Sequence, residues 1–221
     1  MSADWKVIYY EDENSCFEVM EFIEKRMKNK QVKIFSWLSL LEERGPELPQ
    51  PYSDLLKDGI HELRIKLSGK QTWILYFFCF KKFIVLTNVF IKTIDTAPEK
   101  AVSKANERRN FSYADLMIRS LGGYTMKTLK RHFNQKLKDE RFKEMYIEEK
   151  RFAEISLMLH EAREMNALSQ KEVAKKAHIT QQQLSKVENG VNCNIITFLK
   201  VCNALGLDIN FNRPPSTKKS A

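Results

Sequence analysis

The sequence predicts two parts of different fold class: an α+β N-terminal domain, with an antiparallel sheet and helices, followed by an all-α domain. Residues 60–91 contain three short strand-like runs separated by turns, whereas residues 127–205 repeat apolar residues at helical spacing. Because strands repeat every two residues and helices every 3.6, the change of period marks a change of fold. Residues 168–190 add two short helices joined by a tight turn, which is typical of a helix-turn-helix.

The N-terminal elements are predicted in the order β-α-α-β-β-β-α. Strands are expected at 5–10, 60–67, 72–80 and 83–91, and helices at 14–28, 30–44 and from Pro98 to about Phe111. Gly45 and the prolines after it end the pair of helices. The turns at 68–70 and 81–82 are short, so the last three strands should form an antiparallel meander.

The C-terminal part is predicted to be helical throughout. Helices are expected at about 127–140, 150–166, 170–177, 181–189 and 195–205. Gly122-Gly123 looks like a linker, and residues 126–129 look like the natural start of a second protein. We therefore expect an N-terminal domain over 1–111, a linker or join over 112–125, and a C-terminal domain over 126–221 with its core at about 150–211.

Composition narrows the class of protein. The 221 residues are 43% hydrophobic, enough for packed cores, but no apolar run is long enough to span a membrane. The four cysteines and four histidines have no metal-ligand spacing, so neither a metal nor a cofactor is expected. Scattered cysteines in apolar surroundings, without an N-terminal secretion signal, favour free thiols in the cytoplasm.

The net charge of +9 is uneven along the chain. Residues 1–111 hold 18 Lys and Arg against 16 Asp and Glu, which gives +2. Residues 112–221 hold 19 against 12, which gives the remaining +7. This excess accompanies the predicted helix-turn-helix, as expected of a domain that neutralises phosphates.

The stretch LSQKEVAKKAHITQQQLSKVENG, residues 168–190, carries the most specific signal. Ser169 and Thr180 are suited to cap its two helices, because a hydroxyl accepts from an N–H group of the first turn. Gly190 provides the stop. The outward residues of the second helix include three glutamines, which can read adenine in the major groove. The alternative is a solvated helix that happens to be rich in glutamine.

This stretch resembles the helix-turn-helix of lambdoid phage repressors and the Xre family, and the resemblance covers about residues 150–211. It implies that Gln170 grips a phosphate, that Gln181, Gln182 and Lys186 face bases, and that Asn189 reaches the backbone. Thr180, at the start of the second helix, belongs to the same DNA-binding set. The family usually has glycine in the turn, where this chain has His178.

The N-terminal half resembles a second family through the order of its motifs. GIHELRIKLSG, WILYFF, the FIK at 90–92 and the helix after Pro98 are similar in order and spacing to the RelE/HigB toxin superfamily, in particular its phage Gp49-like group. The resemblance covers about residues 4–111 and implies a RelE-like fold. In such operons the gene after the toxin typically encodes a HigA-type Xre antitoxin, which is what the second half resembles.

The resemblance implies a ribosome-dependent mRNA endonuclease, or mRNA interferase, that works without a metal. Positioning and cations would stabilise the transition state as a 2′-hydroxyl attacks the phosphate. The implied catalytic residues are Arg64 and Lys92, with Lys66 as a neighbour on the same strand face. This chain departs from the family at Thr72-Trp73 and at Lys92-Thr93. The alternative is that Arg64 and Lys66 are ordinary solvated strand residues.

Residues 127–149 alternate in charge and carry a thin apolar seam. They either form a solvated helix or bind the toxin-like N-terminal half and cover its basic face. Phe142, Met145 and Tyr146 are large for exposed positions, which favours a toxin–antitoxin interface.

Two functions remain open at this point. The first is a type II toxin–antitoxin module on one chain, in which the antitoxin half neutralises the toxin and represses its own operon as a homodimer. Its partners would be operator DNA and mRNA on the ribosome. The second is a plain transcriptional repressor whose N-terminal half is an inert dimerisation or sensing domain.

Overall fold

The computed structural model describes residues 5–91, 98–121 and 127–210, apart from the side chains of residue 81 and residues 111–121. The chain divides into two compact units, Met1–Arg151 and Phe152–Ala221. The long helix α5 (Glu140–Met165) contributes to both units. None of the helices in these described ranges is long and apolar enough to cross a membrane.

The first unit is built on a mixed five-stranded sheet with the strand order β1-β5-β4-β3-β2. Its strands are β1 (Lys6–Tyr9), β2 (Ser53–Lys57), β3 (Ile60–Leu67), β4 (Lys70–Cys79) and β5 (Phe83–Ile91). The predicted antiparallel meander is confirmed as β3, β4 and β5, and β1 joins β5 in parallel at the edge. This α+β unit followed by a helical one agrees with the predicted fold class.

Strand β2 was missed by the sequence analysis. It pairs antiparallel with β3 through the two-residue turn Asp58-Gly59, whose φ angles are 52° and 74°. The β3–β4 turn at Ser68-Gly69 has the same left-handed form, with φ of 48° and 81°. Because two consecutive positive φ angles match the twist of paired strands, Asp-Gly is a strong hairpin signal. It could have revealed the extra strand.

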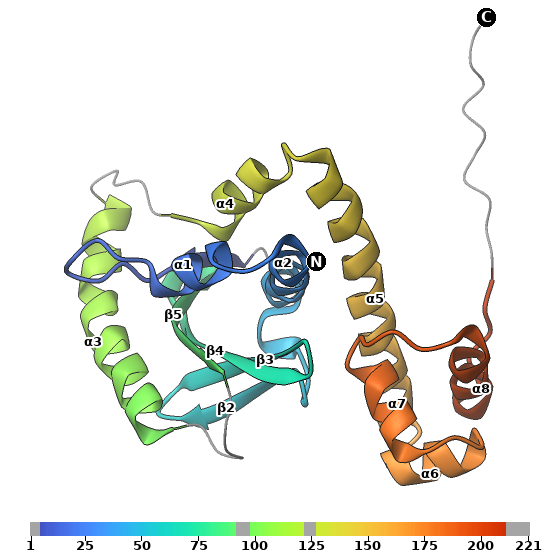
Figure 1. The fold of residues 1–221 in the computed structure, drawn as a ribbon. Helices are drawn as coiled ribbons and strands as arrows, with labels where there is room; N and C mark the ends of the chain where they lie inside the picture. The colour runs from blue at the N-terminus through green and yellow to red at the C-terminus, as the bar shows by residue number, and fades with distance from the viewer. Residues whose placement is uncertain (1–4, 92–97, 122–126, 211–221) are drawn as a thin grey trace, which may run out of the picture. The chain divides into compact units, whose positions relative to one another are not determined.

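Helices cover both faces of the sheet (Figure 1). The helices α1 (Glu18–Glu24) and α2 (Lys28–Arg44) contact β5 and β3, respectively, and lie on one face. The helix α3 (Glu99–Leu121) packs on the other face, where Ala105 joins the apolar cluster formed by Ile60, Leu75 and Phe77. This helix is about ten residues longer than predicted. Short 3-10 turns occur at Gly45–Glu47 and Phe80–Lys82.

Strand β4 forms the middle of the core. Its residues Trp73, Ile74, Leu75, Tyr76 and Phe77 are each no more than 3% exposed. A continuous apolar run of this length fits a strand that is covered on both faces, because alternate side chains then meet different layers. The sequence TWILYFFCF therefore reflects the position of β4 between α3 and the α1–α2 pair.

The first unit continues beyond α3 with α4 (Leu129–Lys136) and the first turns of α5. Thr128 caps α4 by accepting from Arg131 N, and it also forms an isolated bridge with Ile8 of β1. The side chain of Asp139 accepts from Phe142 N at 3.1 Å, which explains why α5 begins at Glu140 rather than near residue 150.

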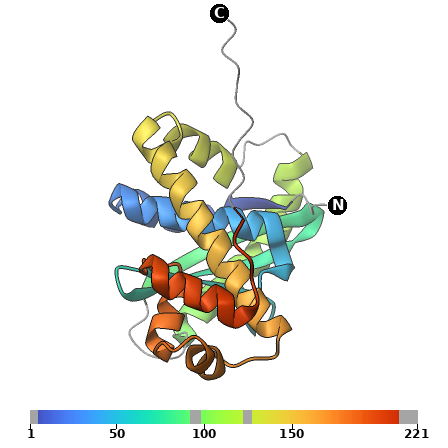
Figure 2. The same cartoon turned by 90° about the vertical axis from the view of Figure 1, so that its right-hand side faces the viewer.

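The second unit contains the end of α5 and three short helices, α6 (Gln170–Lys176), α7 (Gln181–Glu188) and α8 (Ile195–Leu205). All four contribute to one apolar core, which includes Leu159, Val173, Leu184 and Val201. Figures 1 and 2 show α6, α7 and α8 gathered around the last turns of α5.

Candidate functional sites

The helix-turn-helix forms from local signals at both of its helix starts. Ser169 and Thr180 accept from the third N–H of α6 and α7, and in return Glu172 and Gln183 bond the backbone N–H of the cap residues. Each start is thus a complete capping box, which satisfies two backbone donors at once. The predicted caps are confirmed.

The turn between the two helices places His178 at φ 51°, the left-handed region that a glycine usually occupies. Behind the turn, Ala174 and Ala177 are 4% and 3% exposed, and Leu184 is fully buried. Small residues on α6 let α7 cross closely over it. The two helices therefore pack closely, with histidine at the strained position of the turn.

The candidate DNA-reading residues lie on the outer side of α7. Gln181, Gln182 and Lys186 are exposed, and Gln183, which is also exposed, uses its side chain in the capping box. Two glutamine amides and a cation one turn later are therefore presented at the surface. A glutamine amide can donate to and accept from the edge of adenine.

Three other residues of the predicted DNA-binding set have structural roles in this unit. Thr180 caps α7. Asn189 is the C-terminal cap of α7, and its Nδ2 donates to Ser185 O in the last turn at 2.6 Å. Gln170 donates from Nε2 to a carboxylate oxygen of Glu188 at 2.7 Å, which fixes the Gln170 side chain at the start of α6.

A buried charge network holds this surface from behind, and the sequence analysis did not identify it. Glu188, only 1% exposed, accepts from Arg163 Nε at 2.6 Å and from Gln170. His160 Nδ1 lies 2.9 Å from Arg163 Nη2. Burial alone would raise the pKa of Glu188, but hydrogen bonds from His160, Arg163 and Gln170 hold that pKa below its usual value. The network ties α5, α6 and α7 together.

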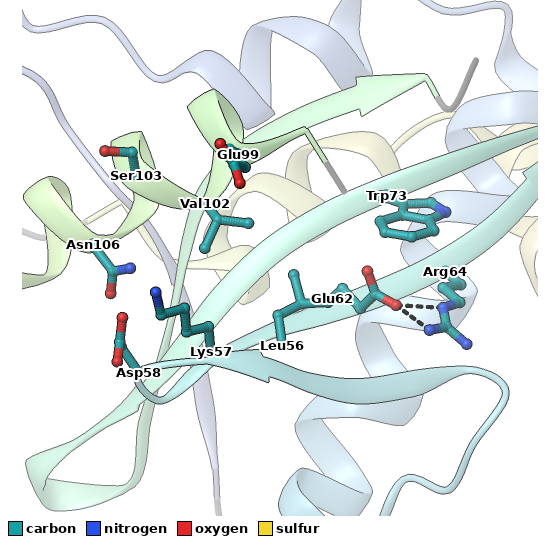
Figure 3. A pocket seen from close by; sticks show the side chains of 10 residues that line it. All are labelled: Leu56, Lys57, Asp58, Glu62, Arg64, Trp73, Glu99, Val102, Ser103 and Asn106. Atoms are coloured by element: carbon teal, nitrogen blue, oxygen red, sulfur yellow. Dashed lines mark hydrogen bonds and ion pairs between the residues drawn. The ribbon is translucent and has the colours of Figure 1, made fainter. Parts of the chain in front are cut away.

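A cavity of about 720 Å³ opens on the α3 face of the sheet (Figure 3). Strands β2, β3 and β4 form its floor and α3 its wall. Its polar lining includes the predicted catalytic residue Arg64, with Lys57, Glu62, Ser103 and Asn106. Figure 3 shows Arg64 turned toward Glu62 at one end, while Lys57 and Asp58 lie nearer Asn106 at the other.

Arg64 is held by several partners at once. It forms an ion pair with Glu62, whose side chain is fully buried, and its Nη2 lies 3.3 Å from Asp54 Oδ2. Its guanidinium also lies 5.3 Å from the centre of the Trp73 ring. Trp73 therefore packs against the arginine, and two carboxylates balance its charge.

The other predicted catalytic positions are placed differently. Lys66 is half-buried on the same face of β3 as Arg64, but the lining of the cavity does not include it. Lys92 lies outside the described residues. Lys57, which was not predicted, is exposed and lines the cavity from β2. It was missed because the strand that carries it was missed.

His61 stands on the opposite face of β3 from Arg64. Its ring stacks on Tyr76 with centroids 5.4 Å apart and meets Phe78 edge-on at 5.0 Å. Burial lowers the pKa of His61. This arrangement gives His61 a packing role and places it away from the cavity.

Residues 128–151 pack against α1 and α2 through an aromatic cluster. Phe142 is 1% exposed and meets Phe35 of α2 at 5.8 Å between ring centroids, and Phe133 lies 5.3 Å from the same ring. The ring of Tyr146 lies 4.4 Å from that of Phe133, tilted by 58°, and its hydroxyl donates to Ser39 Oγ at 3.0 Å. Met145, the third residue of the predicted interface, is half-buried.

Polar contacts surround this aromatic cluster. Glu24 at the end of α1 accepts from Lys136 and lies 2.5 Å from His132 Nε2, and His132 Nδ1 lies 2.9 Å from Tyr9 Oη. Further ion pairs join Lys28 to Asp139, Lys33 to Glu149 and Lys150 to Glu43. These contacts fall on α1 and α2, not on the α3 face that carries Arg64, so the expectation that the segment covers the basic face is wrong. The segment reaches the helices on the other side.

The cysteines are free, and no group of three His, Cys, Asp or Glu within the described ranges is arranged to hold a metal ion.

An α+β domain with a polar cavity, followed by an exposed helix-turn-helix, is the architecture of a protein that joins a DNA-binding motif to a separate α+β domain. Residues 21–110 match the family described as phage derived protein Gp49-like (DUF891), and residues 159–212 match the helix-turn-helix family. The chain thus joins a Gp49-like, toxin-family domain to an Xre-type helix-turn-helix, the arrangement of a toxin fused to an antitoxin. No curated protein resembles the chain closely enough to count as a match.

Proposed function

We propose that the chain is a toxin–antitoxin module on one polypeptide. The Gp49-like domain is a ribosome-dependent mRNA endonuclease, the segment 128–151 restrains it, and the helix-turn-helix binds operator DNA to repress its own operon. The observation that carries this proposal is the position of residues 128–151. They lie between the two family matches and pack on the Gp49-like domain through Phe142, Tyr146 and their surrounding ion pairs.

The DNA-binding part of the proposal is supported by the surface of α7. Gln181, Gln182 and Lys186 are exposed together on a helix whose start is rigidly capped. Bases are read by amide groups, and phosphates are bound by cations and helix starts. The charge of +7 in residues 112–221 adds the attraction to phosphate that does not depend on sequence.

The nuclease part of the proposal places the reaction in the cavity on the α3 face. The oxygen of a 2′-hydroxyl bonds in line to the neighbouring phosphorus and gives its proton to water, while the bond from that phosphorus to the 5′-oxygen of the next nucleotide breaks and the leaving oxygen takes a proton from water. The products would be a 2′,3′-cyclic phosphate and a 5′-hydroxyl, and negative charge grows on the phosphate oxygens in the transition state. Arg64, fixed by Glu62 and Asp54, would orient the phosphate, and the exposed Lys57 would supply the second cation. Lys66 and Lys92 remain candidate contributors.

The restraint proposed for residues 128–151 is indirect. The segment packs against α1 and α2, whereas the cavity opens on the other face of the sheet. The segment therefore does not fill the cavity. The segment would instead neutralise the domain by covering part of the large surface that the domain needs for docking on a ribosome. The predicted interface residues Phe142, Met145 and Tyr146 belong to this proposal.

The test compares the whole chain with a fragment that ends at residue 121, which retains α3 and lacks the restraining segment. The fragment should stop bacterial growth and cause cleavage of translated mRNA, and the whole chain should be tolerated. The fragment with Arg64→Lys is the matched control, because it keeps the positive charge and changes the fixed geometry. A fragment that folds but does not stop growth would show that the Gp49-like domain is not a toxin.

The second candidate function is a plain transcriptional repressor with an inert N-terminal domain. One observation favours it: the charge of Arg64 is balanced by two carboxylates, and one of them is fully buried. An arginine in this setting also suits a purely structural role. A harmless fragment combined with sequence-specific DNA binding by the whole chain would support this alternative.

A further inference from the structure

The helix α4 and its two flanks carry an exposed cationic surface that neither candidate site includes. The exposed residues form two rows at intervals of four, which a helix of 3.6 residues per turn places side by side on one face. The opposite side of α4 is buried, and there His132 lies against Glu24 of α1. The surface is here called the α4 face, and its six exposed residues are Lys127, Lys130, Arg131, Asn134, Gln135 and Lys138.

The positive charge of the C-terminal half is concentrated at this face. Residues 127–138 contain five Lys and Arg and no Asp or Glu, which gives +5 of the +7 found over residues 112–221. Residues 159–212, which match the helix-turn-helix family, contain six Lys and Arg against five Asp and Glu, which gives only +1. The largest excess of cations in this half therefore lies at α4 rather than on the helix-turn-helix.

The protein itself does not balance this charge. Within the described part of the chain, Lys127, Lys130, Arg131 and Lys138 form no ion pair, and Lys127 contacts only the ring of Phe17, at 4.0 Å. The first turn of α4 holds cations and no acidic residue, although the start of a helix favours negative charge. Lys127 and Arg131, four residues apart, also repel each other. The arrangement is unfavourable for the helix alone, and an anionic partner would offset its cost.

A pocket beside the α4 face could receive one phosphate group. It has a volume of about 280 Å³ and lies between α1 and α4. Because a water molecule takes about 30 Å³, the pocket has room for a phosphate and several waters. Arginine can bind a phosphate through two parallel hydrogen bonds, and lysine adds a point charge. The lining, which in the described residues contains no carboxylate, consists of Met20, Lys127, Thr128, Arg131, His132 and Gln135.

The distribution of the polar groups favours single-stranded RNA as the occupant. Lys130 and Lys138 belong to the α4 face but not to the pocket, so the face suits a chain of phosphates better than a single one. A single strand can bend to place one phosphate in the pocket, whereas a DNA duplex is stiff over about 50 nm. The amides of Asn134 and Gln135 can donate to and accept from a 2′-hydroxyl, which RNA has and DNA lacks.

We propose that the α4 face binds the backbone of single-stranded RNA, with one phosphate in the pocket between α1 and α4. This site is distinct from the cavity that contains Arg64, because the two linings share no residue. The inference goes beyond the proposed function, since binding at the α4 face requires neither a ribosome nor cleavage of the RNA.

The experiment measures the binding of labelled oligouridine to the whole chain by fluorescence anisotropy at several salt concentrations. The triple variant Lys127→Ala/Lys130→Ala/Arg131→Ala should weaken binding at least about tenfold and reduce the salt slope by about 2, because each cation on a single strand contributes about 0.7. The matched control replaces three exposed lysines of α6 by alanine, at positions 171, 175 and 176. It removes the same charge and should weaken binding less than about threefold.

A second variant separates binding from folding. Lys130→Glu/Arg131→Glu places two acidic residues in the first turn of α4, where they favour the helix. This variant should unfold at no lower temperature than the natural chain and should bind oligouridine more weakly than the alanine variant. A folded variant of this kind that binds RNA as tightly as the natural chain would overturn the inference.

The other outcomes also decide the matter. Equal losses for the α4 and α6 variants would show that only total charge matters, and equal affinity for oligodeoxyuridine or tighter binding of duplex DNA at α4 would overturn the assignment to RNA. Since no cleavage is measured, an inactive nuclease domain leaves the inference standing. A chain that cleaves mRNA on ribosomes but does not bind oligouridine would keep the proposed function and overturn the inference.

Discussion

At the scale of single residues, Arg64 and Glu62 define the cavity of the Gp49-like domain. Glu62 is fully buried, so its charge needs the guanidinium beside it. Asp54 and Trp73 hold that guanidinium from two further sides. The same contacts that would orient a phosphate also contribute to the folding of the domain.

Arg64→Ala should therefore lower the free energy of unfolding by about 3 kcal/mol, because a buried carboxylate loses its partner. The double variant Glu62→Leu/Arg64→Leu should recover most of this loss, since it removes both charges. Urea titrations of the whole chain measure both effects. If the single variant loses less than about 1 kcal/mol, Glu62 does not depend on Arg64 for its stability.

The glutamines of α7 are expected to act on DNA rather than on folding. Gln181→Ala and Gln182→Ala should each weaken operator binding by about 1–3 kcal/mol and relax the preference at one base pair. Lys200→Ala, at an exposed position of α8, is the control and should cost much less. Equal losses for all three variants in a binding titration would show that only total charge matters.

At the scale of elements, the docking of α4 depends on His132. Its ring bridges Tyr9 and Glu24 and is 7% exposed. Burial lowers the pKa of His132 from its ordinary value of 6.5, against the opposing effect of Glu24, while Lys136 and Lys127 also lower it. The neutral imidazole is thus the form that fits between β1, α1 and α4.

The contribution of His132 should therefore depend on pH. Because its pKa is lower in the folded chain than in the unfolded one, this contribution is complete above about pH 6.5. It is lost as the pH falls through the lowered pKa. The free energy of unfolding between pH 7.5 and 5 should fall more steeply for the natural chain than for His132→Gln. The burial that lowers the pKa of His61 acts in both proteins and cancels. Parallel curves would show that His132 does not titrate in this range.

The sequence predicted those elements whose signals are local. The caps Ser169 and Thr180 were predicted from hydroxyls before apolar runs, and β4 from its unbroken apolar sequence. Strand β2 was missed because its residues SDLLK do not alternate clearly, although the Asp58-Gly59 turn marks its end.

Sequence patterns did not predict contacts between residues that lie far apart in the chain. The bond between Tyr9 and His132 joins residues 123 positions apart, and the Arg163–Glu188 pair joins two separate helices. Neither has a spacing that a single sequence displays. Of the residues that line the cavity, the sequence identified only Arg64 as a candidate catalytic residue, since Lys57 and Asn106 reach the cavity from elements whose packing the sequence does not specify.

At the scale of the whole molecule, the uneven charge should dominate the salt dependence of DNA binding. Most of the net charge lies in residues 112–221, and each phosphate that is neutralised releases counterions. A complex with 6–10 phosphate contacts should lose about 10³–10⁵ in affinity between 50 mM and 200 mM salt. Titrations at several salt concentrations measure the slope. A nearly flat dependence would contradict phosphate binding by this half of the chain.

We propose that the segment 128–151 restrains a ribosome-dependent nuclease within the same chain. The most direct test measures cleavage of mRNA on translating ribosomes by the whole chain, its variant Phe142→Ala/Tyr146→Ala, and the matched control Lys143→Ala at an exposed position of α5. We expect little cleavage by the natural chain and the control, and strong cleavage by the double variant. Adding Arg64→Lys to the double variant should abolish this cleavage, whereas EDTA should not. Strong cleavage by the natural chain, or none by a folded double variant, would contradict it.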